Sequence, residues 1–149
     1  RQGIVPVLDT EVLFAFNPKD KHHKYAKKLL ELIRAGKIGD VHITDVALLE
    51  FVTVLRSKGK DVNAICRLLR SLEAIVARYG IVETCTLSVE VLLKGMDFLQ
   101  KGVSFFDALI AASAENVDGI IISNDAIYDK LGLRRIALKA VDEKLAERL

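Results

Sequence analysis

Short apolar runs rich in β-branched residues alternate along the chain with longer stretches in which apolar residues recur at helical spacing. The short runs predict strands at residues 4–8, 41–43, 81–84, 119–122 and 133–137. Stripes that follow the i, i+3, i+4, i+7 rule predict amphipathic helices around residues 25–33, 62–79 and 89–99. Residues 45–56 are apolar on nearly every side, so we expect that helix to be buried on most of its faces.

The five predicted strands are continuous apolar runs and do not alternate between apolar and polar residues. This pattern is typical of strands that are covered on both faces, as in a parallel sheet between two layers of helices. We therefore expect an α/β protein with three α/β/α layers, a short parallel sheet of about five strands, and seven or eight helices. No internal repeat or linker interrupts the pattern, which predicts a single domain over residues 1–149.

Composition narrows the classes of protein that remain possible. The 149 residues are 51% hydrophobic and 28% charged, and the formal net charge is only +2, which excludes a polycation or an acidic tail. Cys66 and Cys85 are not in a Cys-x-x-Cys spacing, which excludes a zinc site of paired cysteines and predicts reduced thiols in the cytoplasm. No apolar run reaches the roughly 18 residues that a membrane span requires.

Four carboxylates lie in or directly after apolar segments, where an unpaired charge is costly. Asp9 follows the first predicted strand, and Asp125 follows the fourth. Glu50 lies inside the apolar helix at residues 45–56, and Asp107 lies near the start of another apolar helix. Each position deserves a structural as well as a functional interpretation.

The structural interpretations are specific. Ser104 and Asp107 have the spacing of a capping box, and Asp125 suits the cap of a following helix. Asp9 suits a turn, and Glu50 suits a buried ion pair with a lysine or arginine. The functional interpretation takes all four together, because ligands of parallel α/β sheets bind beyond the carboxyl ends of the strands.

Converging carboxylates repel one another unless a cation neutralises them. Ligand sets that contain only oxygen select hard ions such as Mg²⁺ or Mn²⁺. A hard metal ion in an acidic cleft lowers the pKa of a bound water and polarises a phosphate, which is the chemistry of phosphodiester hydrolysis. A phosphatase that carries two aspartates after its first strand is disfavoured, because Glu11 stands where the second aspartate is needed.

The order and spacing of four sequence blocks across the chain resemble the PIN-domain ribonucleases, in particular the small VapC-type toxins. The blocks are Val7-Leu8-Asp9-Thr10, Leu48-Leu49-Glu50-Phe51, Phe106-Asp107-Ala108-Leu109 with the alanine-rich run that follows, and Ile121-Ile122-Ser123-Asn124-Asp125. Each block alone is a weak motif. The last has Ser123 where the family more often has threonine.

The resemblance implies an endoribonuclease in which Asp9, Glu50, Asp107 and Asp125 bind one or two Mg²⁺ or Mn²⁺ ions. By the same resemblance, Asp9 and Asp107 hold the metal directly, while Glu50 and Asp125 complete its shell and orient the attacking water. Thr10, Ser123 and Asp129 take supporting roles, with Asp129 ranked lowest because it also suits a solvated helix. The implied partners are RNA, an antitoxin protein and a second copy of the chain.

A basic surface is predicted beside these carboxylates, on or next to two consecutive helices. Its members are Arg56, Lys58, Arg67, Arg70 and Arg78. These side chains suit contacts with an RNA backbone, and equally a docking face for an acidic partner. The alternative function is a PIN-like module that binds RNA or protein with little or no nuclease activity.

Overall fold

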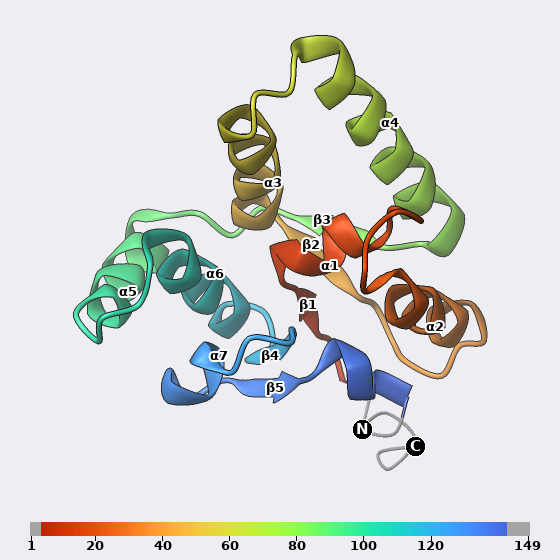
Figure 1. Cartoon of the computed structure of the whole chain (residues 1–149). Coiled ribbons are helices and arrows are strands. Elements are labelled where there is room, and N and C mark those ends of the chain that lie inside the picture. The colour runs from red at the N-terminus through yellow and green to blue at the C-terminus, as the bar shows by residue number, and fades with distance from the viewer. Residues whose placement is uncertain (1–3, 143–149) are drawn as a thin grey trace.

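The computed structural model describes residues 4–142 and contains a central sheet with helices packed around it (Figure 1). Its strands are β1 (Val7–Leu8), β2 (His42–Thr44), β3 (Val82–Thr84), β4 (Ile120–Ile122) and β5 (Arg134–Ile136). Its helices are α1 (Thr10–Ala15), α2 (His23–Arg34), α3 (Asp45–Ser57), α4 (Val62–Tyr79), α5 (Val89–Leu99), α6 (Phe105–Glu115) and α7 (Ile127–Lys130), followed by a 3-10 turn, η1 (Leu138–Ala140).

All five strands are parallel and lie in the order β3-β2-β1-β4-β5, so β1 is central. Val7 of β1 pairs with His42 on one side and with Ile121 on the other. Parallel pairing requires helical crossovers, and these cover both faces of the sheet. The three-layer α/β/α prediction is confirmed. The ends of the predicted domain, residues 1–3 and 143–149, lie outside the described residues.

The core divides into two apolar clusters, one on each face of the sheet. Leu8, Ile43 and Ile122 pack on the face covered by α1, α2 and α4. Val7 and Ile121, their neighbours along the strands, pack on the opposite face with α5, α6 and α7. Successive strand residues point to opposite faces, so burial on both sides explains why β1 and β4 are apolar throughout. The edge strands β3 and β5 instead carry exposed polar residues, Glu83 and Arg134.

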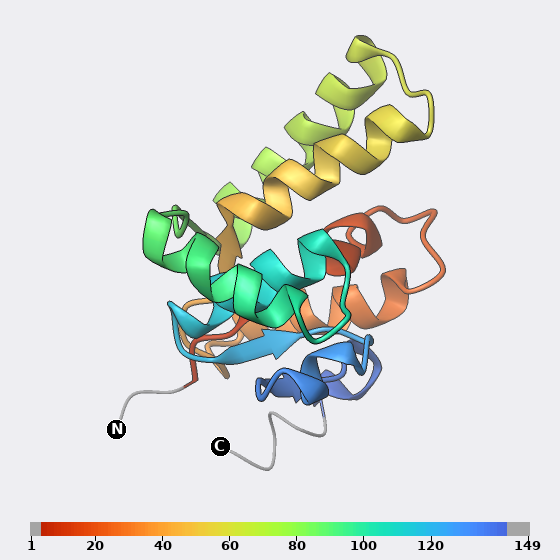
Figure 2. The ribbon, with the colours of Figure 1, turned by 90° about the vertical axis from the view of Figure 1, so that its left-hand side faces the viewer.

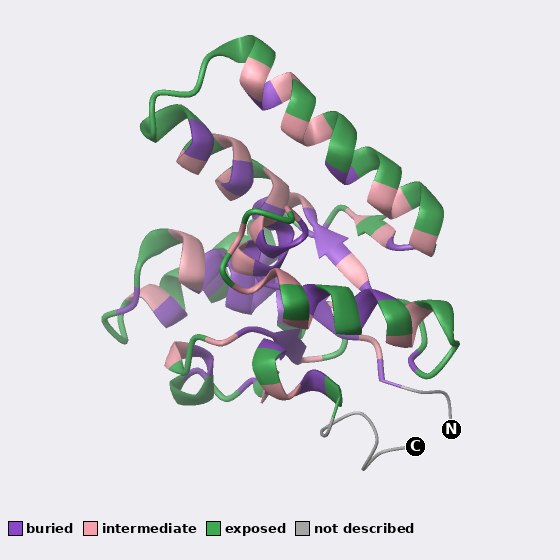
Figure 3. Ribbon diagram, turned by 45° about the vertical axis from the view of Figure 1, so that its right-hand side comes forward, coloured by how far each residue is buried: buried purple, intermediate pink, exposed green. Residues whose placement is uncertain are grey.

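The expectation that the helix at residues 45–56 is buried on most sides is only partly correct. In α3, Val46, Ala47, Phe51 and Leu55 are buried, but Leu49 is 56% exposed. Figures 2 and 3 show the reason: α3 and α4 run side by side away from the sheet, so the part of α3 that α1, α4 and α6 do not cover faces solvent. The most enclosed helix is instead the alanine-rich α6, in which every residue from 108 to 114 is buried.

The cysteines and the lengths of the helices complete the description of the fold. Cys66 and Cys85 are both free. Within residues 4–142, no helix combines the length and the apolar character needed to cross a membrane.

Asp45, the first residue of α3, fastens the segment between β3 and α5 to the rest of the fold. Its carboxylate accepts hydrogen bonds from the Thr86 hydroxyl at 2.7 Å and from the backbone N–H groups of Val46, Thr86 and Leu87 at 3.0–3.1 Å. Burial raises the pKa of Asp45, but these hydrogen bonds outweigh burial and hold the pKa below its ordinary value of 3.8.

We expect Asp45→Ala to lower the free energy of unfolding by about 2 kcal/mol at pH 7, because hydrogen bonds to a charged acceptor are lost. A lowered carboxyl pKa stabilises the fold above the unfolded pKa, and this contribution disappears as pH falls through the folded value. The difference from wild type should therefore shrink below pH 3.8. Urea titrations at several pH values measure it, with the exposed Asp40→Ala as control; an equal loss for both variants would contradict the assignment.

Candidate functional site

Three of the four predicted carboxylates come from three different elements and meet beyond the carboxyl end of β1. Asp9 is the N-cap residue of α1, directly after β1. Glu50 lies in α3, which begins where β2 ends, and Asp107 lies in the first turn of α6. The parallel sheet places the start of α1 and of α3 at one edge, as the sequence predicted.

Asp9 is 7% exposed and is held by donors that carry no charge. Its Oδ1 accepts from the backbone N–H of Thr10 at 2.8 Å, and its Oδ2 accepts from the Ser123 hydroxyl at 2.6 Å. Burial raises the pKa of Asp9 to about 7; the Ser123 hydrogen bond lowers it, and the nearby charge of Glu11 raises it. Among the described residues, no lysine or arginine pairs with Asp9, and neutral hydrogen-bond donors alone hold its carboxylate.

Glu50 is half-buried and is oriented by Thr10, whose hydroxyl donates to its Oε1 at 2.5 Å. Burial raises the pKa of Glu50; the Thr10 hydrogen bond opposes that shift, and the charge of Asp107 adds to it. Among residues 4–142, the only ion pairs are Lys94–Glu115 and Arg135–Asp129. Glu50 therefore has no lysine or arginine partner in the described part of the chain, and the structure does not support its interpretation as half of a buried ion pair.

The Asp107 side chain does not take the capping role that its spacing from Ser104 suggested. Ser104 is the N-cap residue of α6, and its hydroxyl accepts from the Asp107 N–H at 3.3 Å. The Asp107 carboxylate takes no part in that cap. Its Oδ1 accepts instead from the hydroxyl of Tyr128 at 3.3 Å, which leaves the side chain turned toward Asp9 and Glu50.

Sequence reasoning missed two residues of this cluster, Tyr128 and Glu11. The Tyr128 hydroxyl lies 3.1 Å from Asp9 Oδ1 as well as 3.3 Å from Asp107 Oδ1. Glu11 Oε1 accepts from the Ser123 hydroxyl at 3.0 Å and from the backbone N–H of Asn124. In the sequence, Glu11 is informative only as a mismatch to another class of enzyme, and Tyr128 resembles an ordinary core residue. A partial signal for Glu11 was its spacing, two residues after Asp9 at the same sheet edge.

The carboxylates of Asp125 and Asp129 form no hydrogen bond with this network, although the Asp125 backbone N–H donates to the Ser123 hydroxyl oxygen at 3.0 Å. Asp125 is exposed, and its Oδ1 accepts from the N–H of Ile127 at 3.0 Å, which is the cap-like contact considered from sequence. Asp129 forms two hydrogen bonds with the Arg135 guanidinium, at 3.0 and 3.1 Å. The structure therefore links Asp9 with Glu50 through Thr10, and Asp9 with Asp107 through Tyr128. The carboxylates of Asp125 and Asp129 take no part in these links.

The donor chemistry of the cluster fits a hard divalent cation. Asp9, Glu50 and Asp107 supply only oxygen atoms, and no lysine or arginine among the described residues neutralises them. Across residues 4–142, no three His, Cys, Asp or Glu side chains are already close enough to form a complete metal site. A bound cation would therefore have to draw these carboxylates closer together.

The five basic residues singled out from sequence lie on the part of the molecule formed by α3 and α4. Arg56, Lys58, Arg67, Arg70 and Arg78 are all exposed. The Lys58 ammonium lies 5.4 Å from the ring centre of Phe14, and the Arg78 guanidinium lies 5.7 Å from that of Tyr79. None of the five forms an ion pair within residues 4–142, so their charges face solvent.

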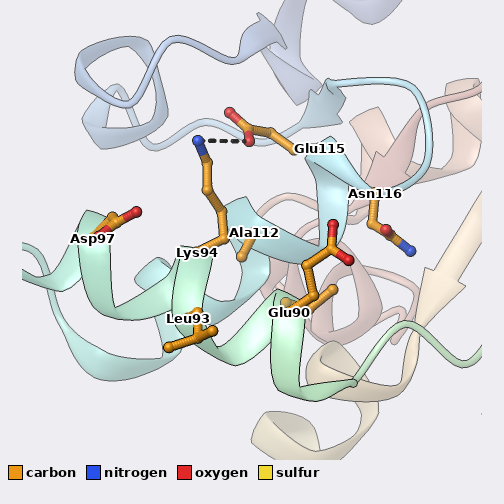
Figure 4. Close-up of a pocket in the computed structure, with 8 residues that line it drawn as sticks. Glu90, Leu93, Lys94, Asp97, Ala112, Glu115 and Asn116 are labelled. Carbon is orange, nitrogen blue, oxygen red and sulfur yellow. Dashed lines mark ion pairs between the residues drawn. The ribbon is translucent and has the colours of Figure 1, made fainter.

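A pocket of about 430 Å³ lies elsewhere, between α5 and the end of α6 (Figure 4). Its charged lining includes Glu90, Asp97 and the Lys94–Glu115 ion pair, whose charged atoms are 3.3 Å apart. It contains none of the clustered carboxylates. We assign it no role.

Comparison with known proteins identifies the class that this fold and acidic cluster define. The family model of the PIN domain matches residues 7–133. The chain therefore belongs to the PIN-domain family. No curated protein matches at the level of sequence.

Solved structures that share this fold include two from toxin–antitoxin systems. One is the VapBC2 complex of Rickettsia felis, bound to a DNA fragment from its promoter, with 20% identity, a TM-score of 0.64, and coverage of 89% of this chain and 98% of that chain. The other is VapC20 of Mycobacterium tuberculosis, a toxin that cleaves the sarcin–ricin loop, with 19% identity, a TM-score of 0.59, and coverage of 85% and 95%.

The raised pKa of Asp9 predicts an unusual pH dependence of stability in metal-free protein. Because the folded pKa of about 7 exceeds the ordinary 3.8, the folded state binds the proton more tightly, and stability falls as pH rises between these values. Asp9→Asn removes this loss. We therefore expect its free energy of unfolding to exceed that of wild type by about 1–3 kcal/mol at pH 8 and to be nearly equal to it at pH 4. Denaturant titrations with chelator measure this, with Asp97→Asn as control; parallel pH profiles for wild type and Asp9→Asn would contradict it.

Proposed function

We propose that this chain is an endoribonuclease that depends on Mg²⁺ or Mn²⁺. The observation that supports the proposal most is the meeting of Asp9, Glu50 and Asp107, from three elements, without a cationic partner among the described residues. A fold gains no stability from such an arrangement, because buried like charges repel. Membership of the PIN-domain family and the likeness to a toxin that cleaves RNA point to the same activity.

Each clustered side chain has a task in this proposal. Bound Mg²⁺ or Mn²⁺ would lower the pKa of a coordinated water and stabilise charge on the attacked phosphate. Asp9 and Asp107 would hold the ion, with Asp9 fixed by Ser123 and the Thr10 backbone. Glu50, oriented by the Thr10 hydroxyl, accepts the proton of the attacking water.

Asp125 remains a proposed ligand, which requires its carboxylate to leave the Ile127 N–H. Asp129 keeps its proposed supporting role only if its bonds to Arg135 open.

The basic residues of α3 and α4 are proposed to hold the RNA backbone. Glu50 and Arg56 share α3, and six residues of helix place their backbones about 9 Å apart along the axis. Contacts of this kind bind phosphates without reading sequence, so the proposal leaves the identity of the RNA open. The same surface would suit an acidic protein partner.

The proposal extends to partners and organisation. We propose that the chain acts as a single PIN-like domain in the cytoplasm, and that an antitoxin protein controls it, in line with the VapBC2 complex that shares its fold. We also propose a homodimer, supported by an exposed apolar surface on and beside α5 that includes Val89, Leu93 and Phe105. The alternative is a module that binds RNA or protein without cleaving it.

We expect wild type to cleave a mixed RNA pool when Mn²⁺ is present and to stop when chelator is added. Asp9→Asn and Asp107→Asn should each reduce the cleavage rate at least about 100-fold, because a proposed metal ligand loses its charge. The exposed Asp40→Asn should cleave at the wild-type rate. Gel assays of cleavage against Mn²⁺ concentration measure these rates.

If wild type and Asp9→Asn are equally inert while the protein still binds RNA or a protein partner, the binding-module alternative is correct. If all variants cleave equally without added metal, a contaminating nuclease or a different site is responsible, and the proposal is wrong.

A further inference from the structure

Tyr128 is the largest side chain in the described part of the molecule that is fully excluded from solvent. It belongs to α7, and its ring packs in the apolar cluster that includes Val7, Ile110 and Ile121. The hydroxyl is the one polar atom of this side chain. Burial of a phenol is costly unless its hydroxyl finds a hydrogen-bond partner.

The Tyr128 hydroxyl has two partners, and both are carboxylates of the proposed metal site. It lies 3.1 Å from Asp9 Oδ1 and 3.3 Å from Asp107 Oδ1. One partner would have satisfied a buried phenol. The hydroxyl carries a single proton, which it gives to one of the two carboxylates at a time or shares between them, and its oxygen thereby links the N-cap of α1 with the first turn of α6.

The neighbouring contacts show which carboxylate oxygens this bridge leaves available. Asp9 Oδ2 is held by Ser123, and Glu50 Oε1 is held by Thr10. No described residue hydrogen-bonds Asp107 Oδ2 or Glu50 Oε2. A neutral donor can hold two carboxylates near each other without neutralising their charge, which a lysine or arginine could not do.

We infer that Tyr128 is a positioning residue, whose hydroxyl keeps Asp9 and Asp107 beside each other and so limits how far they must move to bind a divalent cation. This inference rests on the proposed function, because it assigns Tyr128 a task toward the metal that the carboxylates are proposed to bind. Tyr128 does not touch the substrate. It acts through the two side chains that it bridges.

Tyr128→Phe tests the inference, because it removes the hydroxyl and keeps the ring that fills the core. Mn²⁺ affinity is measured by the electron paramagnetic resonance signal of free Mn²⁺, and RNA cleavage is measured as a function of Mn²⁺ concentration. We expect Mn²⁺ binding to weaken about tenfold, as for the loss of a group that orients a metal ligand. Cleavage at saturating Mn²⁺ should stay within about threefold of wild type. Tyr25→Phe, on α2, is the matched control and should change neither.

Three results would overturn the inference: Mn²⁺ affinity unchanged in Tyr128→Phe, a cleavage defect that saturating Mn²⁺ does not restore, or no Mn²⁺ binding by wild type. Wild type that binds Mn²⁺ but does not cleave RNA would refute the proposed function alone, and the affinity ratio would still decide the role of Tyr128.

A second measurement uses wild type and does not depend on the folding of the variant. In magnetic resonance spectra, the Tyr128 hydroxyl proton should be protected from exchange with water, and its resonance should move when diamagnetic Mg²⁺ is added. A hydroxyl proton that exchanges rapidly, or that Mg²⁺ leaves unchanged, would contradict the bridge between Asp9 and Asp107.

Discussion

Repulsion between carboxylates at the carboxyl end of β1 is the constraint on which the site depends. The order of the parallel sheet places Asp9 at its centre, and α3 and α6 bring Glu50 and Asp107 beside it. The fold tolerates this repulsion through neutral donors, because Thr10, Ser123 and Tyr128 hold the carboxylates without cancelling their charge. Burial raises the pKa of Asp9 and of Glu50, and a nearby negative charge adds to each shift, that of Glu11 for Asp9 and that of Asp107 for Glu50.

The same constraint links stability with chemistry. Asp45 shows the opposite behaviour to Asp9. Its carboxylate accepts four hydrogen bonds, its pKa is lowered, and it stabilises the segment before α5. Asp9 has donors too, but its deeper burial dominates and its pKa rises. Asp45 therefore stabilises the fold, whereas the burial of Asp9 lowers the stability of the fold, as is typical of functional sites.

The sequence predicted the architecture well and the site in part. Continuous apolar strands indicated a parallel sheet covered on both faces, and Asp9, Glu50 and Asp107 stood out because they interrupt apolar segments. The extent of α3 burial was overestimated, because apolar composition does not say whether a helix lies on the sheet or projects with α4. Tyr128 was missed because a tyrosine in an apolar helix carries no sign of where its hydroxyl points. Whether Asp125 joins the site stays a prediction, since a residue just after a strand suits a cap and a ligand equally.

The central claim is that Asp9, Glu50 and Asp107 form one cation site, and anomalous diffraction from crystals grown with Mn²⁺ tests it most directly. The account predicts a Mn²⁺ peak within coordination distance of oxygen atoms from Asp9 and Asp107, with Glu50 bound directly or through a water. Absence of a peak at this position under saturating Mn²⁺, or a peak only at exposed carboxylates such as Asp125 and Asp129, would contradict the account.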